Sequence, residues 1–160
     1  TLSAIQARPS EKGFTLVEML LVIAIISILA AMAISNFSNA SQDTRDIVSR
    51  QQLAVVQEAV NHYGNREIGR VTTSGGPGKT VAQVMGAYNL GITDSGTVGT
   101  GTVKDRFNVF KRYLDEATLA NLTVDTANSR VTSQAMRDVS KYLTLPTWEA
   151  ASYPKVQLNP

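Results

Sequence analysis

The segment GFTLVEMLLVIAIISILAAMAISNF, from Gly13 to Phe37, decides the fold of this chain. Between Phe14 and Ile34 its single ionisable side chain is Glu18. A helix of this length, rising about 1.5 Å per residue, is long enough to cross a hydrocarbon core of about 30 Å. An acid in an apolar helix costs on the order of 3 kcal/mol to insert unless a partner answers its charge. We therefore expect a membrane span in which Glu18 has a partner.

The residues before the span are polar and end in glycine. They include Arg8, Glu11 and Lys12, and Gly13 stands directly before Phe14. A secretory signal peptide would place its cleavage site after the apolar segment instead. Any processing of this chain is therefore expected before the span.

The heptapeptide KGFTLVE, residues 12–18, followed by the apolar run, resembles the class III leader and mature start of type IV pilins and type II secretion pseudopilins. In that family a prepilin peptidase cuts after the glycine, the new N-terminal Phe is N-methylated, and the helices of the mature subunits pack into a filament core. The resemblance implies cleavage after Gly13, methylation of Phe14, and a subunit-registering role for Glu18. The alternative is an uncleaved signal anchor with Glu18 at the membrane interface.

Elementary electrostatics gives these residues a mechanism. Cleavage would create a cationic amine at Phe14, and Glu18 lies about one helical turn away. If helices stack with an axial stagger, Glu18 of one subunit could meet the amine of the next. Such a desolvated pair favours a defined register more than it adds net stability.

Periodicity extends the helix beyond the span. Apolar residues recur at spacings of three and four after Asn36, and Gly64 suits a left-handed helix end after Tyr63. A helix from Phe14 to Tyr63 would measure about 75 Å. The residues that form the predicted apolar face are Ile47, Val48, Gln52, Leu53, Val55, Val56, Ala59, Val60 and Tyr63. The predicted domains are a leader (1–13), a transmembrane and filament-core helix (14–37), an amphipathic half of the long helix (38–64) and a globular head (65–160).

The predicted fold class is α+β and type IV pilin-like, with a head that contains short helices and a small antiparallel sheet. The sheet follows from the resemblance and is weakly marked in the sequence. The local patterns predict a helix from Thr80 to near Gly91, a helix with an aromatic face from Asp105 to Ala117, a possible hairpin over 119–131, a helix over 133–143, and short or edge strands in the tail, 142–160.

Composition limits the chemistry. The 160 residues carry a net charge of +2 and no cysteine, which excludes a disulfide framework and thiolate metal sites and makes nucleic acid an improbable partner. The absence of cysteine also predicts that the C-terminal region is held by packing alone. No cofactor, metal site or catalytic group is predicted, and His62, the one histidine, is interpreted as a surface cation. The run Gly75 to Thr80 is similar to the end of a phosphate-binding loop, but Thr73 stands where the motif needs glycine.

These features predict a structural subunit rather than an enzyme. The expected partners are copies of itself in a helical filament, a prepilin peptidase, an inner-membrane assembly platform, and the membrane before assembly. The expected location is the inner membrane as a single-pass precursor, then an extracellular or periplasmic filament. The alternatives are a minor pilin or membrane-anchored binding protein, for adhesion or DNA uptake, and a secretion pseudopilin. The few acids near the C-terminus favour a pilus over a calcium-binding pseudopilin.

Overall fold

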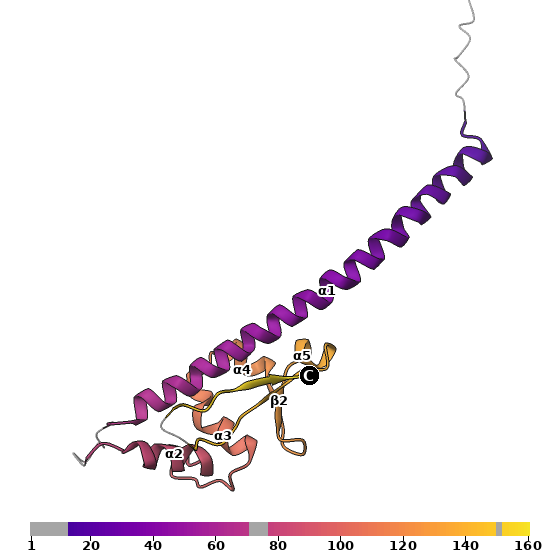
Figure 1. Ribbon diagram of the computed structural model, residues 1–160. Coiled ribbons are helices and arrows are strands. Elements are labelled where there is room, and N and C mark those ends of the chain that lie inside the picture. Colours follow the sequence, from indigo (N-terminus) through magenta and orange to yellow (C-terminus); the bar gives the residue numbers. More distant parts are fainter. Residues whose placement is uncertain (1–12, 71–76, 150–151) are drawn as a thin grey trace, which may run out of the picture. The chain divides into compact units, whose positions relative to one another are not determined.

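The computed structural model of the chain describes residues 13–70, 77–149 and 152–160, with Ser35 described by its backbone alone (Figure 1). The described residues form two compact units that divide between Ser41 and Gln42. Of the predicted leader, only Gly13 belongs to the described residues. The predicted domain boundaries therefore stay a prediction.

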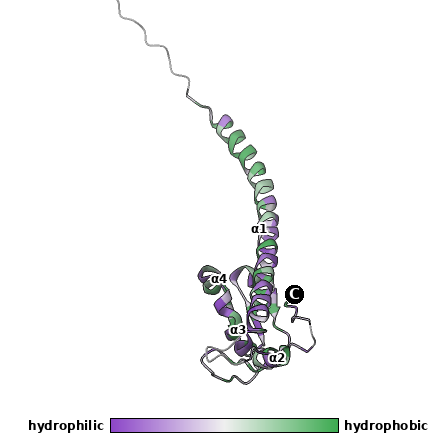
Figure 2. Ribbon diagram, turned by 90° about the vertical axis from the view of Figure 1, so that its left-hand side faces the viewer, coloured by the Kyte–Doolittle hydropathy of each residue, from purple (hydrophilic) through white to green (hydrophobic). Residues whose placement is uncertain are grey.

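The first unit is the N-terminal part of helix α1 (Leu16–Glu67). Its large apolar side chains are exposed in the isolated chain, with Phe14 at 79%. Figure 2 shows this part of α1 as predominantly hydrophobic. By length and composition alone, α1 is long and apolar enough to cross a membrane.

The second unit contains the rest of α1, short helices and a four-stranded antiparallel sheet (Figure 1). In the sheet the strands follow the order β1 (Thr123–Asp125), β2 (Arg130–Thr132), β3 (Tyr142–Thr144) and β4 (Gln157–Asn159). Val131 of β2 pairs with Val124 on one side and Leu143 on the other. The remaining elements of this unit are α2 (Val81–Leu90), α3 (Val103–Phe110), the 3-10 helix η1 (Lys111–Tyr113), α4 (Glu116–Asn121) and α5 (Gln134–Asp138). The predicted α+β class, a long apolar N-terminal helix with a small mixed head, is confirmed.

The core of the second unit lies between α1, the short helices and one face of the sheet. From α1 the residues Val56, Ala59, Val60 and Tyr63 are buried at helical spacing, as the periodicity predicts. The buried side chains that meet them include Val84, Tyr88, Phe110, Val131, Met136, Leu143 and Trp148. Ile47, which the predicted face included, is instead 65% exposed.

The predicted end of α1 at Tyr63 is wrong, because the helix continues to Glu67. Gly64 lies inside the helix, and a Cβ at this position would collide with the ring of Tyr153. This glycine serves close approach by the C-terminal segment, not a left-handed turn. The left-handed conformation occurs at Gly69, where φ is 75°.

Two predicted helices of the head are shorter than expected. The pattern from Asp105 to Ala117 is divided among α3, η1 and α4, because Asp115 caps α4 and accepts a hydrogen bond from the Thr118 amide at 2.8 Å. The pattern over 133–143 is helical only to Asp138, and its last residues form strand β3.

Other local predictions are confirmed. Helix α2 begins after Thr80 and ends at Gly91, whose φ of 73° is left-handed. Strands β1 and β2 form the predicted hairpin, and the tail contributes the short edge strand β4.

Candidate functional site at the start of helix α1

The start of α1 is a reciprocal cap made by Thr15 and Glu18. The Thr15 amide donates to Glu18 Oε2 at 2.8 Å, and the Thr15 hydroxyl donates to the same oxygen at 2.9 Å. In return the Glu18 amide donates to Thr15 Oγ1 at 3.2 Å. This is a capping box, which satisfies two amides that a helix start otherwise leaves without partners. Glu18 therefore has a local partner within its own chain.

The cap made by Thr15 was not predicted, although the sequence contains its signature. The spacing T-x-x-E directly before an apolar run is the signature of a capping box. The same chain repeats the device with an amide at the start of α2, where Thr80 and Gln83 exchange the equivalent bonds at 2.9 and 3.3 Å. A glutamine in this position thus supports the same cap.

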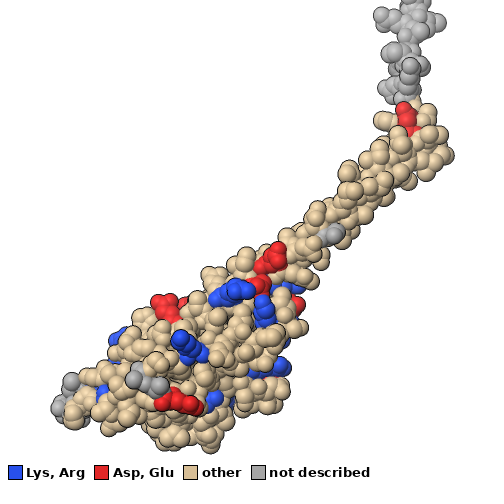
Figure 3. Space-filling view, in the orientation of Figure 1, with Lys and Arg blue, Asp and Glu red and all other residues tan. Residues whose placement is uncertain are grey.

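Both hydrogen bonds that Thr15 donates end on the same carboxylate oxygen of Glu18, Oε2. Among the residues that the structure describes, no group donates a hydrogen bond to its Oε1. The carboxylate is drawn back toward the helix start and keeps one oxygen for a further donor. No charged residue occurs between Glu18 and Asp43, and Figure 3 shows the intervening helix almost without blue or red.

Gly13 and Phe14 precede the cap. A Cβ built at Gly13 meets no described atom within 4 Å, so packing within the described residues does not require a glycine here. Phe14 is exposed. The structure does not test the roles expected for Gly13, Phe14 and Glu18, which stay predictions.

Residues 8–34 match the family model of the prokaryotic N-terminal methylation motif. The chain carries the N-terminal motif of type IV pilin-like proteins. The match supports a type IV pilin-like or pseudopilin precursor, a group of proteins that is generally structural. Searches among curated proteins and among solved structures gave no match to the chain.

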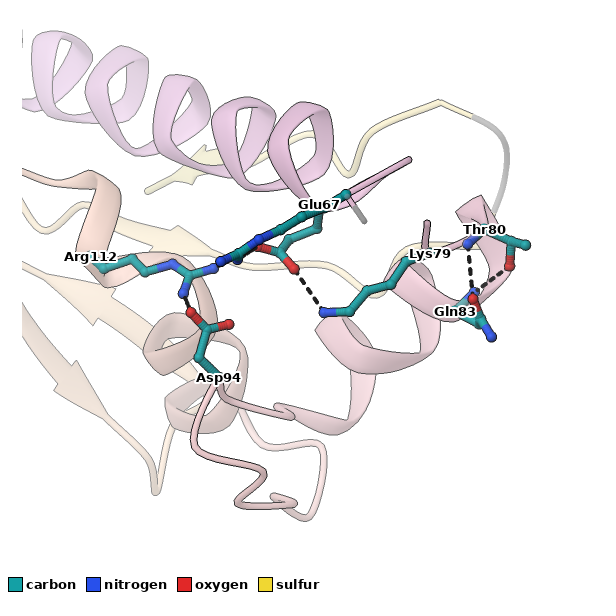
Figure 4. A network of polar contacts seen from close by, with 7 residues as sticks. Glu67, Lys79, Thr80, Gln83, Asp94 and Arg112 are labelled. Atoms are coloured by element: carbon teal, nitrogen blue, oxygen red, sulfur yellow. Dashed lines mark hydrogen bonds and ion pairs between the residues drawn. The ribbon is translucent and has the colours of Figure 1, made fainter. Parts of the chain in front are cut away.

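The second unit contains a buried carboxylate whose partners the sequence did not predict. Glu67, 1% exposed, accepts hydrogen bonds from Arg70 at 3.0 Å, Lys79 at 2.7 Å and Arg112 at 2.8 Å. Figure 4 shows Glu67 between Lys79 and Arg112, with Asp94 beyond Arg112. Arg70 is a near neighbour in sequence, but Lys79 and Arg112 lie 12 and 45 residues away, so only the folded chain brings these two cations to Glu67.

The contacts of Lys79 and Thr80 argue against a phosphate-binding loop over residues 75–80. Thr73, Gly75 and Gly76 lie outside the described residues. Of the remaining positions, Lys79 is engaged by Glu67, and Thr80 caps α2. The two side chains that would contact a nucleotide thus have structural partners instead.

His62 also has a partner that the sequence reading overlooked. Its Nε2 lies 3.5 Å from Oε1 of Glu58, one turn earlier on α1, and both side chains are exposed. The described residues contain no cluster of three or more His, Cys, Asp or Glu side chains placed to hold a metal ion.

The C-terminal segment is fastened to the head by amide side chains as well as by packing. Asn89 donates to the Trp148 carbonyl at 2.9 Å and accepts from its amide at 2.7 Å. Gln57 donates to the Pro154 carbonyl at 3.1 Å and accepts from the Val156 amide at 2.7 Å. The expectation that packing alone holds this region is therefore incomplete.

Proposed function

We propose that this chain is a structural subunit of a type IV pilus-like filament, cleaved after Gly13 and polymerised through its apolar N-terminal helix. One observation carries the proposal. The exposed apolar part of α1 contains a single acid, Glu18, which is held at the helix start with one oxygen free of hydrogen bonds among the described residues. An exposed apolar surface of this size needs a membrane or a protein partner.

The geometry supports the following assembly step. A prepilin peptidase removes the leader, and methylation of Phe14 leaves the new amine cationic at neutral pH. The amine of an incoming subunit binds the free Oε1 of Glu18 on its neighbour, while Oε2 keeps the Thr15 cap. The pair forms only at one axial stagger, because apolar side chains elsewhere along the helices offer no alternative charge. Apolar packing supplies the affinity and the charge pair fixes the register.

The proposed partners follow from this step. They are copies of the same chain in a helical filament, the prepilin peptidase, an inner-membrane assembly platform, and the membrane that holds the precursor. The proposed final location is an extracellular or periplasmic filament. The apolar helix near the start fits a membrane-anchored precursor.

The test compares Glu18→Gln with Glu18→Ala in cells that assemble the filament. Glutamine keeps the cap, as Gln83 does in α2, but removes the charge, whereas alanine removes both. Asp43→Asn is the matched control, since it removes one exposed acid beyond the apolar segment. The measurements are the mass of the mature N-terminus and the ratio of subunit in sheared filaments to cleaved subunit in the membrane.

We expect both Glu18 variants to accumulate as cleaved, methylated monomers in the membrane. Their filament yield should fall at least about tenfold, because the variants lose a preference of about 1.4 kcal/mol for the productive stagger over the others. Asp43→Asn should assemble normally. A normal yield from Glu18→Gln with a defect in Glu18→Ala would assign the role to the cap and refute the charge pair. Residues before Phe14 in assembled filaments would refute the cleavage site, and a scarce subunit in wild-type filaments would indicate a minor pilin.

A further inference from the structure

The second unit has a cationic hollow near the end of α1. Its volume is about 410 Å³, within the range of small-molecule sites. The residues that line this hollow are Arg66, Arg70, Asp94, Arg112 and Tyr113. Three guanidinium groups and one carboxylate thus face one space, and guanidinium groups are the protein's best donors for bidentate recognition of oxyanions.

Buried Glu67 fixes two of these arginines in place. Arg70 Nη1 and Arg112 Nη2 both donate to Glu67 Oε1, at 3.0 and 2.8 Å. A guanidinium has five N–H donors, so each arginine keeps others for a ligand. The ring of Tyr113 lies 4.9 Å from the Arg112 guanidinium and supports it from one side. The donors are therefore held in position before a ligand arrives, which reduces the ordering cost of binding.

The charges around the hollow do not balance. Four cations, Arg66, Arg70, Lys79 and Arg112, face two acids, Glu67 and Asp94, and the excess is two positive charges. In the described part of the chain Arg66 forms no ion pair, although it lines the hollow.

Asp94 already occupies part of this space as an internal anion. It pairs with Arg112 from the loop after α2, and its side chain is half exposed. Because Glu67 holds Arg112 independently, Asp94 can leave without releasing the guanidinium. An external oxyanion would therefore compete with Asp94 for the same donors.

We propose that this hollow binds a phosphate group, with Arg66, Arg70 and Arg112 as its ligands and Asp94 as a competitor that the phosphate displaces. A phosphate near neutral pH carries up to two negative charges, which matches the excess. The group can come from free phosphate or from a sugar phosphate. The proposal concerns the head alone and does not depend on filament assembly.

The test is calorimetric titration of the full chain in a nonionic detergent and a phosphate-free buffer. The probes are inorganic phosphate and glucose 1-phosphate. The variants are Arg66→Gln, which removes a ligand that has no ion pair within the described residues, and Asp94→Asn, which removes the competitor. Lys111→Gln is the matched control, because it removes one positive charge from η1, next to Arg112, at a residue that does not line the hollow.

We expect wild type to bind inorganic phosphate, Arg66→Gln to weaken binding by about fivefold, and Asp94→Asn to tighten it by about fivefold, with Lys111→Gln within about twofold of wild type. Tighter binding of glucose 1-phosphate than of phosphate assigns the source as a sugar phosphate, and equal or weaker binding assigns free phosphate; both support the site. Equal weakening by Arg66→Gln and Lys111→Gln would overturn the proposal in favour of diffuse attraction. Unchanged or weaker binding in Asp94→Asn would overturn the displacement step, and no heat of binding in wild type would overturn the site itself.

Discussion

Replacement of Glu67 by glutamine tests whether one buried carboxylate holds the head together. The variant keeps the size of the side chain but leaves Arg70, Lys79 and Arg112 without their shared anion. Removing one partner from a buried ion pair costs about 3–5 kcal/mol. The three cations are 57, 41 and 35% exposed, so water resolvates them and the expected loss falls to about 2–3 kcal/mol.

The assay is urea denaturation of the full chain in nonionic detergent, followed by tryptophan fluorescence. Trp148 is the single tryptophan and is buried in the second unit, so its emission reports this unit alone. Glu58→Gln is the matched control, because it removes an acid from the same helix at a side chain that is 72% exposed. We expect the control within about 0.5 kcal/mol of wild type. Coincident transitions of Glu67→Gln and Glu58→Gln would refute the role of the network.

The pH dependence of this loss gives a second readout. Burial by itself would raise the pKa of Glu67, but hydrogen bonds and charge from Lys79, Arg70 and Arg112 outweigh burial and hold the pKa below its ordinary value of 4.5. The unfolded carboxyl therefore binds a proton at higher pH than the folded one. The stabilisation is complete above the unfolded pKa and is lost as pH falls through the folded pKa. The difference between wild type and Glu67→Gln should thus be largest above about pH 5.5 and shrink steadily below about pH 4.5. A difference that grows on acidification would contradict this sign.

Two further predictions concern stability and use the same assay. Gly64→Ala would press a methyl group into the ring of Tyr153 and should destabilise the head by about 1–3 kcal/mol. Gly86→Ala, in α2 with open space around it, should instead stabilise the head by about 0.5–1 kcal/mol. Equal effects of the two substitutions would refute the close approach of Tyr153 to Gly64. Asn89→Ala removes both hydrogen bonds to the Trp148 backbone and should cost about 2 kcal/mol, so an unchanged midpoint would show that these two bonds do not stabilise the second unit.

The parts of the fold that could be predicted are those whose cause is local. The apolar run and the periodicity after it predict a long helix without reference to any other residue. Helix α2 was equally predictable, because Thr80 caps its start and Gly91 supplies its left-handed end. At the candidate site, the sequence shows that Glu18 is the only acid of the apolar run. The T-x-x-E spacing from Thr15 to Glu18 also predicts the capping box.

The parts that could not be predicted depend on contacts between distant segments. The apolar positions over 133–143 fit a helix, yet Leu143 pairs across strands with Val131 and Leu158, and that pairing overrides the local pattern. Gly64 reads as a helix end until the ring of Tyr153, 89 positions later, is known to need its space. Glu67 looks like an ordinary surface acid, because no spacing in the sequence announces that three cations converge on it.

The cap at Glu18 changes how the charge of this residue should be understood. An unpartnered acid would make insertion of the subunit into the membrane costly, and relief of that cost could itself drive assembly. The bonds from Thr15 already lower the cost in the isolated subunit, so less free energy remains for assembly to recover. What the cap adds is direction, since it holds the carboxylate toward the helix start and leaves one oxygen for a second donor. In the proposed filament Glu18 therefore contributes little to affinity and acts by selecting one stagger. Because Glu18→Gln keeps the cap and removes only the charge, it separates the effect of the charge pair from the effect of the cap.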